Sequence, residues 1–218
     1  MSRPRAVRFA AIIFDMDGVL VDSEPLGLEA MRRVLARHGV PYTERDNEAF
    51  LGVTTPESVR ALRARHALAA SEEELARQYV ANLLELIRER PRPMPGVPEV
   101  LAHLCAAGYR LALASSAEPA VIKTNVTALD LARFFEAVVS GTEVPRGKPA
   151  PDVFLEAARR LGLPPHACLV VEDSRNGLLA AKAGGMACAI VPCASTRHQD
   201  FREADHRLRT LPDLLTIL

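Results

Sequence analysis

Short runs of apolar residues alternate with amphipathic segments over most of the chain. The runs are continuous, which is typical of strands that are buried on both faces of a parallel sheet. They lie at residues 9–15, 110–115, 136–140, 167–172 and 186–191. Segments with helical spacing lie at residues 97–107, 119–128, 151–161 and 175–183. The tail at 204–218 adds one weak strand and a short helix. Strands that alternate with helices in this order predict a doubly wound, Rossmann-like α/β core.

The segment between the first and second apolar runs differs, because all of its periodicity is helical. Helices are predicted at residues 28–38, 55–66 and 71–89. Thr55-Pro56 is a typical first turn, and Ser71 with Glu74 forms a capping box. Three prolines at 91, 93 and 95 end the segment. We therefore predict a core domain formed by residues 1–22 and 92–218, with an all-helical domain inserted at 23–91.

Composition and charge agree with a folded, soluble domain of ordinary kind. The 218 residues are 49% hydrophobic and 25% charged, and 27 Lys and Arg balance 27 Asp and Glu. A zero net charge provides no field that would gather nucleic acid or an anionic membrane. The apolar run at 9–14 is too short for a membrane span of about 20 residues. We expect a cytoplasmic monomer with no nucleic-acid or membrane partner.

The four cysteines form no CxxC pair that would indicate a metal or redox motif. They are Cys105, Cys168, Cys188 and Cys193. Three of these lie in or directly beside predicted helices and strands. We therefore expect buried, reduced thiols, as is usual for a reducing compartment.

Polar residues gather where the predicted strands end. These residues are Asp15, Asp17, Ser115, Ser116, Glu172 and Asp173, with Lys148 at the start of the helix at 151–161. In open α/β sheets the carboxyl ends of the strands share one edge, where ligands bind. Like charges about 4 Å apart repel by a few kcal/mol at an effective dielectric near 20, so such a cluster requires a cation. Mg²⁺ fits best, because it takes one or two carboxylates together with water and a phosphate.

The four motifs, in this order, resemble those of the haloacid dehalogenase-like superfamily. They are Asp15-x-Asp17-Gly18, the strand that ends at Ser115, Gly147-Lys148-Pro149 and Glu172-Asp173. The inserted helices resemble the helical cap domain of that superfamily. The sequence around Asp15 and Lys148 is similar to that found in the branch of the superfamily that contains phosphoglycolate phosphatase, sugar-phosphate phosphatases and β-phosphoglucomutase. The resemblance extends over essentially the whole chain.

The resemblance implies a phosphatase that acts through an aspartyl-phosphate. Asp15 would be the nucleophile, and Asp17 would protonate the leaving oxygen and then accept a proton from water. Mg²⁺ would lie between Asp15, the main-chain carbonyl of Asp17 and Asp173, with Glu172 as a further ligand or close neighbour.

Other residues would bind the phosphoryl group and the rest of the substrate. The Ser115 hydroxyl and the Ser116 N–H would hold phosphoryl oxygens, and Lys148 would neutralise charge. Glu24 and the turn at 50–54 are the expected cap contacts. The substrate would be a small phosphorylated metabolite such as a sugar phosphate or phosphoglycolate.

Each candidate also has a structural interpretation. Asp17-Gly18 is a common turn dipeptide, and Lys148 would be ordinary as a solvated loop residue. Ser115-Ser116 and Glu172-Asp173 would be suitable caps for the helices that follow them. Asn176 would suit either a cap or the site.

A β-phosphoglucomutase-like mutase is the first alternative within the superfamily. The resemblance would place a histidine at 27, an arginine soon after the turn at 50–54 and an asparagine at 119. This chain has Gly27, Thr55 and Pro119 there, so groups that would hold a second phosphate are missing. The sequence therefore favours a phosphatase.

Three other chemistries are less favoured. Dehalogenation needs no metal, whereas Asp17 completes a metal site. Phosphonate hydrolysis would need a cap lysine, and residues 22–90 contain none. A phospho-accepting receiver domain, the non-enzyme alternative, would be about 120 residues long and would lack both the helical insertion and Asp17.

Overall fold

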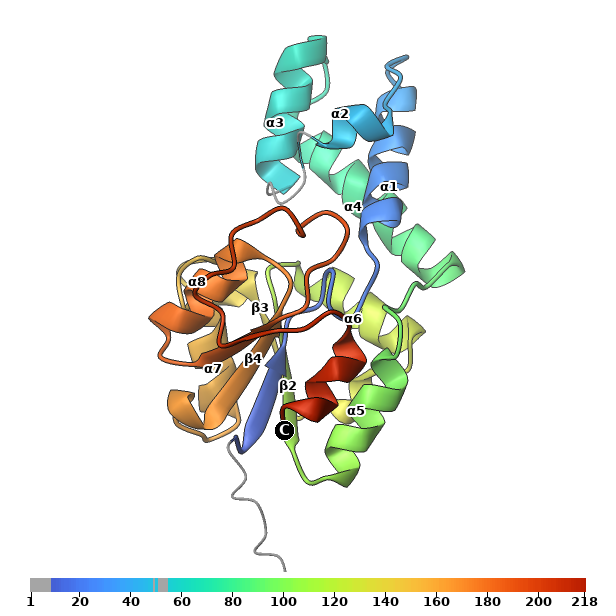
Figure 1. Ribbon diagram of the computed structural model, residues 1–218. Helices are drawn as coiled ribbons and strands as arrows, with labels where there is room; N and C mark the ends of the chain where they lie inside the picture. The colour runs from blue at the N-terminus through green and yellow to red at the C-terminus, as the bar shows by residue number, and fades with distance from the viewer. Residues whose placement is uncertain (1–8, 49, 51–54) are drawn as a thin grey trace, which may run out of the picture. The chain divides into compact units, whose positions relative to one another are not determined.

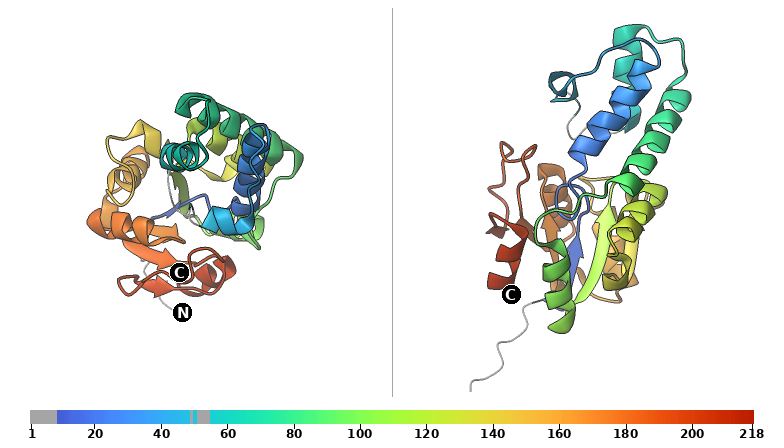
Figure 2. Two further views of the ribbon diagram at one scale, coloured as in Figure 1. Left: turned by 90° about the horizontal axis from the view of Figure 1, so that it is seen from above. Right: turned by 90° about the vertical axis from the view of Figure 1, so that its right-hand side faces the viewer.

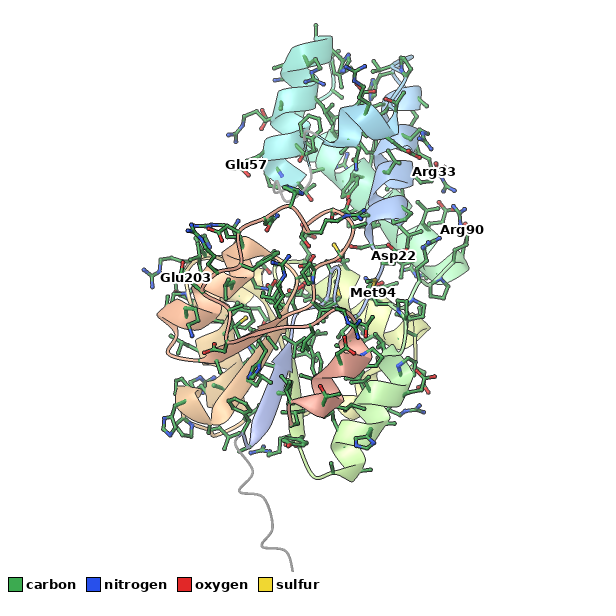
Figure 3. The ribbon with its side chains drawn as sticks, in the orientation of Figure 1. Asp22, Arg33, Glu57, Arg90, Met94 and Glu203 are labelled. Atoms are coloured by element: carbon green, nitrogen blue, oxygen red, sulfur yellow. The ribbon has the colours of Figure 1, made fainter. Side chains whose placement is uncertain are left out.

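The computed structural model describes residues 9–48, 50 and 55–218, and the chain folds as two compact units (Figure 1). One unit combines Met1–Asp22 with Pro93–Leu218, and the other is Ser23–Arg92. Figure 3 labels Asp22 and Met94, which stand close to the two crossings from one unit to the other.

The larger unit is built on one sheet of six parallel strands in the order β3-β2-β1-β4-β5-β6. The strands are β1 (Ala11–Phe14), β2 (Arg110–Ser115), β3 (Ala137–Ser140), β4 (Cys168–Glu172), β5 (Ala187–Ile190) and β6 (His206–Arg207). β1 lies in the middle and is fully buried, which explains why its sequence is a continuous apolar run.

Helices lie on both sides of this sheet (Figure 2). The α-helices are α5 (Val97–Ala106), α6 (Pro119–Ala128), α7 (Asp152–Arg160) and α8 (Arg175–Ala183). The 3₁₀ helices are η1 (Ala132–Phe134), η2 (Gly141–Glu143), η3 (Pro165–Ala167) and η4 (Leu211–Thr216). The buried faces of α7 and α8 pack on Ile13, Ala112 and Val170 of the strands in one apolar cluster. The predicted fold class, a doubly wound parallel sheet with an all-helical insertion, is confirmed.

The smaller unit is entirely helical over its described residues. Its helices are α1 (Glu24–Ala36), α2 (Glu44–Glu48), α3 (Thr55–His66) and α4 (Glu72–Glu89). They share their own apolar core, formed by Met31, Val34, Leu35, Tyr42, Val59, Leu62, Leu68 and Leu75. As the capping pattern predicts, the Ser71 side chain accepts a hydrogen bond from the Glu74 N–H and begins α4.

Helix α2 was not predicted, because its five polar residues carry no apolar stripe. A local signal was nevertheless present in Thr43 and Asp46. The Thr43 N–H donates to Asp46 Oδ2 at 2.9 Å, and the Asp46 N–H donates to Thr43 Oγ1 at 3.3 Å. This reciprocal pair is a capping box with aspartate in place of glutamate.

The two ends of the insertion meet on the larger unit. Val21 and Pro93 form an antiparallel bridge, and the Met94 N–H donates to the Leu20 carbonyl at 3.0 Å. The chain therefore leaves and re-enters the larger unit at one point.

The expectation of buried thiols holds for Cys168 and Cys188, both in strands, and is wrong for the other two. Cys105 is exposed, since it lies outside the buried stripe of α5, and Cys193 is partly exposed in the loop after β5. Among the described residues, no helix is both long and apolar enough to cross a membrane.

Candidate active site

The site lies where the order of the strands changes direction. Counting from β1, the chain adds β2 and β3 on one side, and then β4 and β5 on the other. Asp15 follows β1, and Glu172 and Asp173 stand at the end of β4. The Asp15 N–H donates to the Val171 carbonyl at 2.9 Å, so the two strand ends are joined directly. Ligands bind at such a switch point in open α/β sheets.

Three carboxylates meet at this point. One oxygen each of Asp15, Glu172 and Asp173 lies within 4.8 Å of the others. The residues are 6%, 1% and 7% exposed, so water screens their mutual repulsion poorly. A cation is needed if all three are to be ionised.

Lys148 supplies one positive charge. Its Nζ donates to Asp15 Oδ1 at 2.5 Å and to Glu172 Oε1 at 2.7 Å. The same atom lies 3.4 Å from the Ala114 carbonyl and 4.7 Å from the centre of the Phe154 ring. The lysine side chain is 7% exposed, so the interpretation as a solvated loop residue is wrong.

Glu172 uses both of its oxygens within the protein. Oε1 accepts from Lys148, and Oε2 accepts from the Asp173 N–H, the Ser174 N–H and the Ser174 hydroxyl at 2.8–2.9 Å. Gly177 lies beside this carboxylate, and a Cβ at position 177 would overlap it. Ser174, rather than Glu172 or Asp173, caps α8, since its Oγ accepts from the Gly177 N–H.

Burial and the neighbouring charges shift the pKa values of Asp15, Asp173 and Lys148. Burial raises the pKa of Asp15 to about 7 against the opposing charge of Lys148. Burial, followed by the charges of Glu172 and Asp15, raises the pKa of Asp173 to about 10. Burial alone would lower the pKa of Lys148, but the charges of Asp15 and Glu172 outweigh it and raise that pKa. Without a further cation, Asp15 and Asp173 therefore hold protons at pH values where ordinary carboxyl groups have released them.

A tight turn follows Asp15. The Leu20 and Val21 N–H groups donate to the Met16 carbonyl at 2.8 and 2.9 Å, and Gly18 has a φ of +75°. A Cβ at position 18 would also lie 2.7 Å from Asp173 Cγ. Glycine is required on both counts, because this φ strains other residues and the space is filled. Asp17 lies within this turn, near enough for its charge to raise the pKa of Asp15.

Ser115 ends β2, the strand beside β1, and Ser116 follows it. The Ser115 side chain is buried, and its Oγ accepts from the Ala117 N–H at 3.1 Å, which leaves its proton to donate elsewhere. Glu118 occupies the cap position of α6, so neither serine caps that helix. Lys148 contacts the carbonyl of Ala114 directly before this pair.

Sequence reasoning missed several residues of the cluster. They are Phe154, Gly177, Cys193 and Thr196, while Ser174 is a strand-end residue to which the sequence assigned no role. Cys193 and Thr196 both donate to Asp173 Oδ2, at 3.1 and 3.2 Å. Cys193 lies two residues after the end of the fifth predicted strand at Val191, so a wider reading of the strand-end rule that identified Asp15 and Asp173 would have included it.

Of the other predicted residues, one belongs to the smaller unit, one is exposed on α8, and others are outside the described residues. Glu24 begins α1 in the smaller unit. Of the expected cap turn, residues 51–54 are outside the described residues. Asn176 is exposed in the first turn of α8, where Ser174 already provides the cap.

Comparisons with known proteins agree on one family. A family model described as haloacid dehalogenase-like hydrolase matches residues 9–185. Hexitol phosphatase B of Escherichia coli (strain K12) is 35% identical over 217 residues, which cover 98% of this chain and 97% of that protein. A phosphorylated carbohydrates phosphatase of Thermotoga maritima is 36% identical over 176 residues, 81% of this chain and 82% of that protein. The crystal structure of CbbY from Rhodobacter sphaeroides in complex with phosphate superimposes with a TM-score of 0.85 at 29% identity, over 94% of this chain and 96% of that one.

Proposed function

Because this chain belongs to the haloacid dehalogenase-like hydrolases, we propose that it is a Mg²⁺-dependent phosphatase of small phosphorylated sugars or sugar alcohols. The observation that carries the proposal is the Asp15 carboxylate, buried at the switch point and paired with Lys148 at 2.5 Å. The names of two similar proteins, hexitol phosphatase and phosphorylated carbohydrates phosphatase, support the substrate class.

The donor set suits a hard divalent cation. All three clustered side chains are carboxylates, and burial raises the pKa of Asp15 to about 7 and that of Asp173 to about 10, even though Lys148 is paired with Asp15. A carboxylate has about four lone-pair positions, and Glu172 already accepts four hydrogen bonds. We therefore assign Asp15 and Asp173, with the Asp17 carbonyl, to Mg²⁺, and we assign Glu172 to holding Lys148. The ion would stabilise the negative charge of the transferring phosphoryl group.

In the first step, an Asp15 carboxylate oxygen attacks phosphorus and the bond from phosphorus to the ester oxygen breaks. The leaving oxygen takes a proton from the Asp17 carboxyl, so a neutral alcohol departs. Lys148 fixes Asp15 through Oδ1, which leaves Oδ2 as the attacking atom. The Ser115 hydroxyl and the Ser116 N–H donate to the phosphoryl oxygens during the transfer.

In the second step, water attacks the phosphorus of the aspartyl-phosphate. Asp17, now ionised, accepts a proton from this water, and the bond from phosphorus to Asp15 breaks. Inorganic phosphate leaves, and both carboxyl groups return to their starting states. One difficult displacement is thereby divided into two easier ones.

The mutase alternative is opposed by a contact within the smaller unit. Position 27 is glycine, and the Tyr79 hydroxyl lies 3.2 Å from where a Cβ would stand. A side chain at position 27 would press on this tyrosine, whose hydroxyl would have to move by a few tenths of an ångström. The histidine that the mutase resemblance requires is absent from this position, which supports release of the product to water.

The test is a phosphate-release screen with Mg²⁺ over hexitol phosphates, hexose phosphates and phosphoglycolate, measured as kcat/KM. We expect the highest values for the hexitol and hexose phosphates, and loss of activity with EDTA that Mg²⁺ restores. A preference for phosphoglycolate would contradict the proposed substrate class. Absence of release from every ester would contradict the phosphatase itself.

Two further arms separate the alternatives. Conversion of β-glucose 1-phosphate to glucose 6-phosphate, primed with glucose 1,6-bisphosphate, would indicate the mutase. Stoichiometric, long-lived labelling of Asp15 by a small phosphodonor would indicate the receiver-like alternative. Phosphate release in repeated turnovers supports the enzyme that we propose.

A further inference from the structure

The loop after β5 contacts Asp173 through two side chains. The Cys193 thiol donates to Asp173 Oδ2 at 3.1 Å, and the Thr196 hydroxyl donates to the same oxygen at 3.2 Å. Asp173 and Thr196 are both buried. One oxygen of the carboxylate is thus held by two donors of a neighbouring loop.

The strand register brings this loop to Asp173. β5 pairs in parallel with β4, with Ile190 beside Glu172, and the Val191 N–H donates to the Glu172 carbonyl at 2.8 Å. Cys193 follows two residues later, at the same edge of the sheet as Asp173. The contact therefore depends on paired strands and not on a free loop.

A tight turn orients both donors. The Thr196 and Arg197 N–H groups donate to the Cys193 carbonyl at 3.3 and 3.1 Å. The Cys193 N–H donates to Thr196 Oγ1 at 3.1 Å, so this oxygen serves as an acceptor and its proton is directed to Asp173. The Ser195 hydroxyl lies 3.0 Å from Cys193 Sγ and donates to the sulfur when the thiol proton points to Asp173.

We propose that Cys193 and Thr196 are positioning residues, which fix the rotation of the Asp173 carboxylate so that its other oxygen is presented to a divalent cation. The inference rests on the proposed function, because it requires that Asp173 bind the ion. Mg²⁺ demands nearly ideal octahedral geometry, so a carboxylate that rotates freely binds it less well. Loss of a partner that orients a metal ligand typically costs 10–100-fold in metal affinity.

The test measures cation binding directly on the full chain. Mn²⁺ binding is followed by electron paramagnetic resonance for Cys193→Ala, Thr196→Val and the double variant. We expect the Kd for Mn²⁺ to rise about 10-fold in each single variant and further in the double variant. Cys193→Ser and Thr196→Ser retain a hydroxyl donor and should stay within about threefold of the unaltered protein. Cys105→Ala, which changes an exposed thiol on α5, is the matched control.

Steady-state kinetics separate positioning from a role in loop stability alone. We expect the apparent KM for Mg²⁺ to rise in the alanine and valine variants, while kcat at saturating Mg²⁺ stays within about threefold. A purely structural role would lower the melting temperature and leave the Kd for Mn²⁺ unchanged. If the double variant does not fold, the single serine and alanine variants at Cys193 still give the comparison.

The outcomes distinguish this inference from the proposed function. An unchanged Kd in both single variants, together with loss of Mn²⁺ binding in Asp173→Asn, overturns the positioning role and leaves the metal site intact. An unaltered protein that binds no Mn²⁺ overturns the proposed function together with the inference. A selective rise in Kd that serine rescues supports both.

Discussion

Gly177 gives Glu172 the space in which its carboxylate holds Lys148. A Cβ at position 177 would overlap the Glu172 carboxylate, which accepts from Lys148 Nζ at 2.7 Å. The carboxylate and the glycine stand five residues apart, one at the end of β4 and the other inside α8. The absence of a side chain at position 177 of α8 is therefore part of the geometry of the proposed site.

We expect Gly177→Ala to lower both stability and turnover. Alanine within a helix is ordinarily about 0.5–1 kcal/mol more favourable than glycine, so any loss of stability reports the overlap with Glu172. Displacement of Glu172 would free Lys148 and reduce kcat at least about 10-fold. Urea unfolding and phosphate release measure the two effects. Gly184→Ala at the end of α8, where a Cβ meets neighbours at 3.4 Å, is the control and should leave both nearly unchanged.

Replacement of Lys148 tests the charge balance of the cluster. Lys148→Met leaves two buried carboxylates without their cation, which should cost about 3–5 kcal/mol of unfolding free energy in the metal-free protein. Adding Glu172→Gln should recover part of that loss. Lys182→Met removes an ion pair in which both side chains are about one-third exposed, and should cost less than about 1 kcal/mol. Equal losses of unfolding free energy in Lys148→Met and Lys182→Met would contradict the balance of charge that we describe.

Asp15→Asn should abolish turnover while the protein stays folded. An amide oxygen is a poor nucleophile, and loss of a covalent nucleophile typically lowers kcat by more than about 10³-fold. Circular dichroism checks the fold, and a phosphate-release assay measures the rate. Asp130→Asn, at an exposed aspartate paired with Arg133, provides a matched control with full activity expected. Turnover of Asp15→Asn within tenfold of the unaltered enzyme would exclude Asp15 as the nucleophile.

Asp17→Asn should separate the two chemical steps. The amide cannot accept a proton from water, so the aspartyl-phosphate should accumulate with substrates whose leaving group needs no proton. Acid-quenched samples, measured by intact-protein mass spectrometry, would show the mass of one added phosphoryl group. With ordinary sugar phosphates the reaction should stop before the first step. Unchanged kinetics with both kinds of substrate would rule out proton transfer by Asp17.

The raised pKa values predict how stability depends on pH. Asp15 has a pKa of about 7 in the folded protein against an ordinary 3.8, and Asp173 about 10 against 3.8. The folded protein therefore binds more protons than the unfolded chain above pH 4, and its stability falls as pH rises. In EDTA, the melting temperature should decrease from about pH 5 to about pH 8.

Added Mg²⁺ should flatten this slope, because a bound cation removes the reason for Asp15 and Asp173 to hold protons. Asp15→Asn should also flatten it in EDTA, since one of the two titrating groups is gone. Scanning calorimetry across this pH range makes the comparison. A melting temperature that rises with pH in the metal-free protein would contradict the assignment of raised pKa values.

Most of the larger unit could be predicted from local pattern. The predicted strand at 110–115 and helix at 119–128 agree with β2 and α6 to the residue. Gly108 and Pro119 mark the boundaries of secondary structure there, which makes these limits easy to predict. The order of strands in the sheet is a long-range property, and no single segment carries it. The last helix is 3₁₀ in form, a difference in hydrogen bonding that apolar spacing does not report.

The candidate cluster was predicted less evenly. Asp15, Asp173 and Lys148 could be predicted from the sequence, because charged residues beside apolar strands are unusual. The contacts of Cys193 and Gly177 depend on side-chain packing between β4, β5 and α8. No local sequence pattern indicates this packing. The helix at Glu44–Glu48 was not predicted, because its five polar residues show no apolar periodicity.

The bridge between Val21 and Pro93 has a consequence for how such a chain diversifies. Closing a loop costs conformational entropy that grows only with the logarithm of its length, so exchanging the 70 residues of Ser23–Arg92 for a tenfold shorter turn changes that cost by about 2 kcal/mol. Segments of very different size can therefore be grafted at this junction while the register of the sheet is preserved. Recombination at this pair of adjoining residues would exchange the helical unit and leave the carboxylate cluster of the larger unit in place.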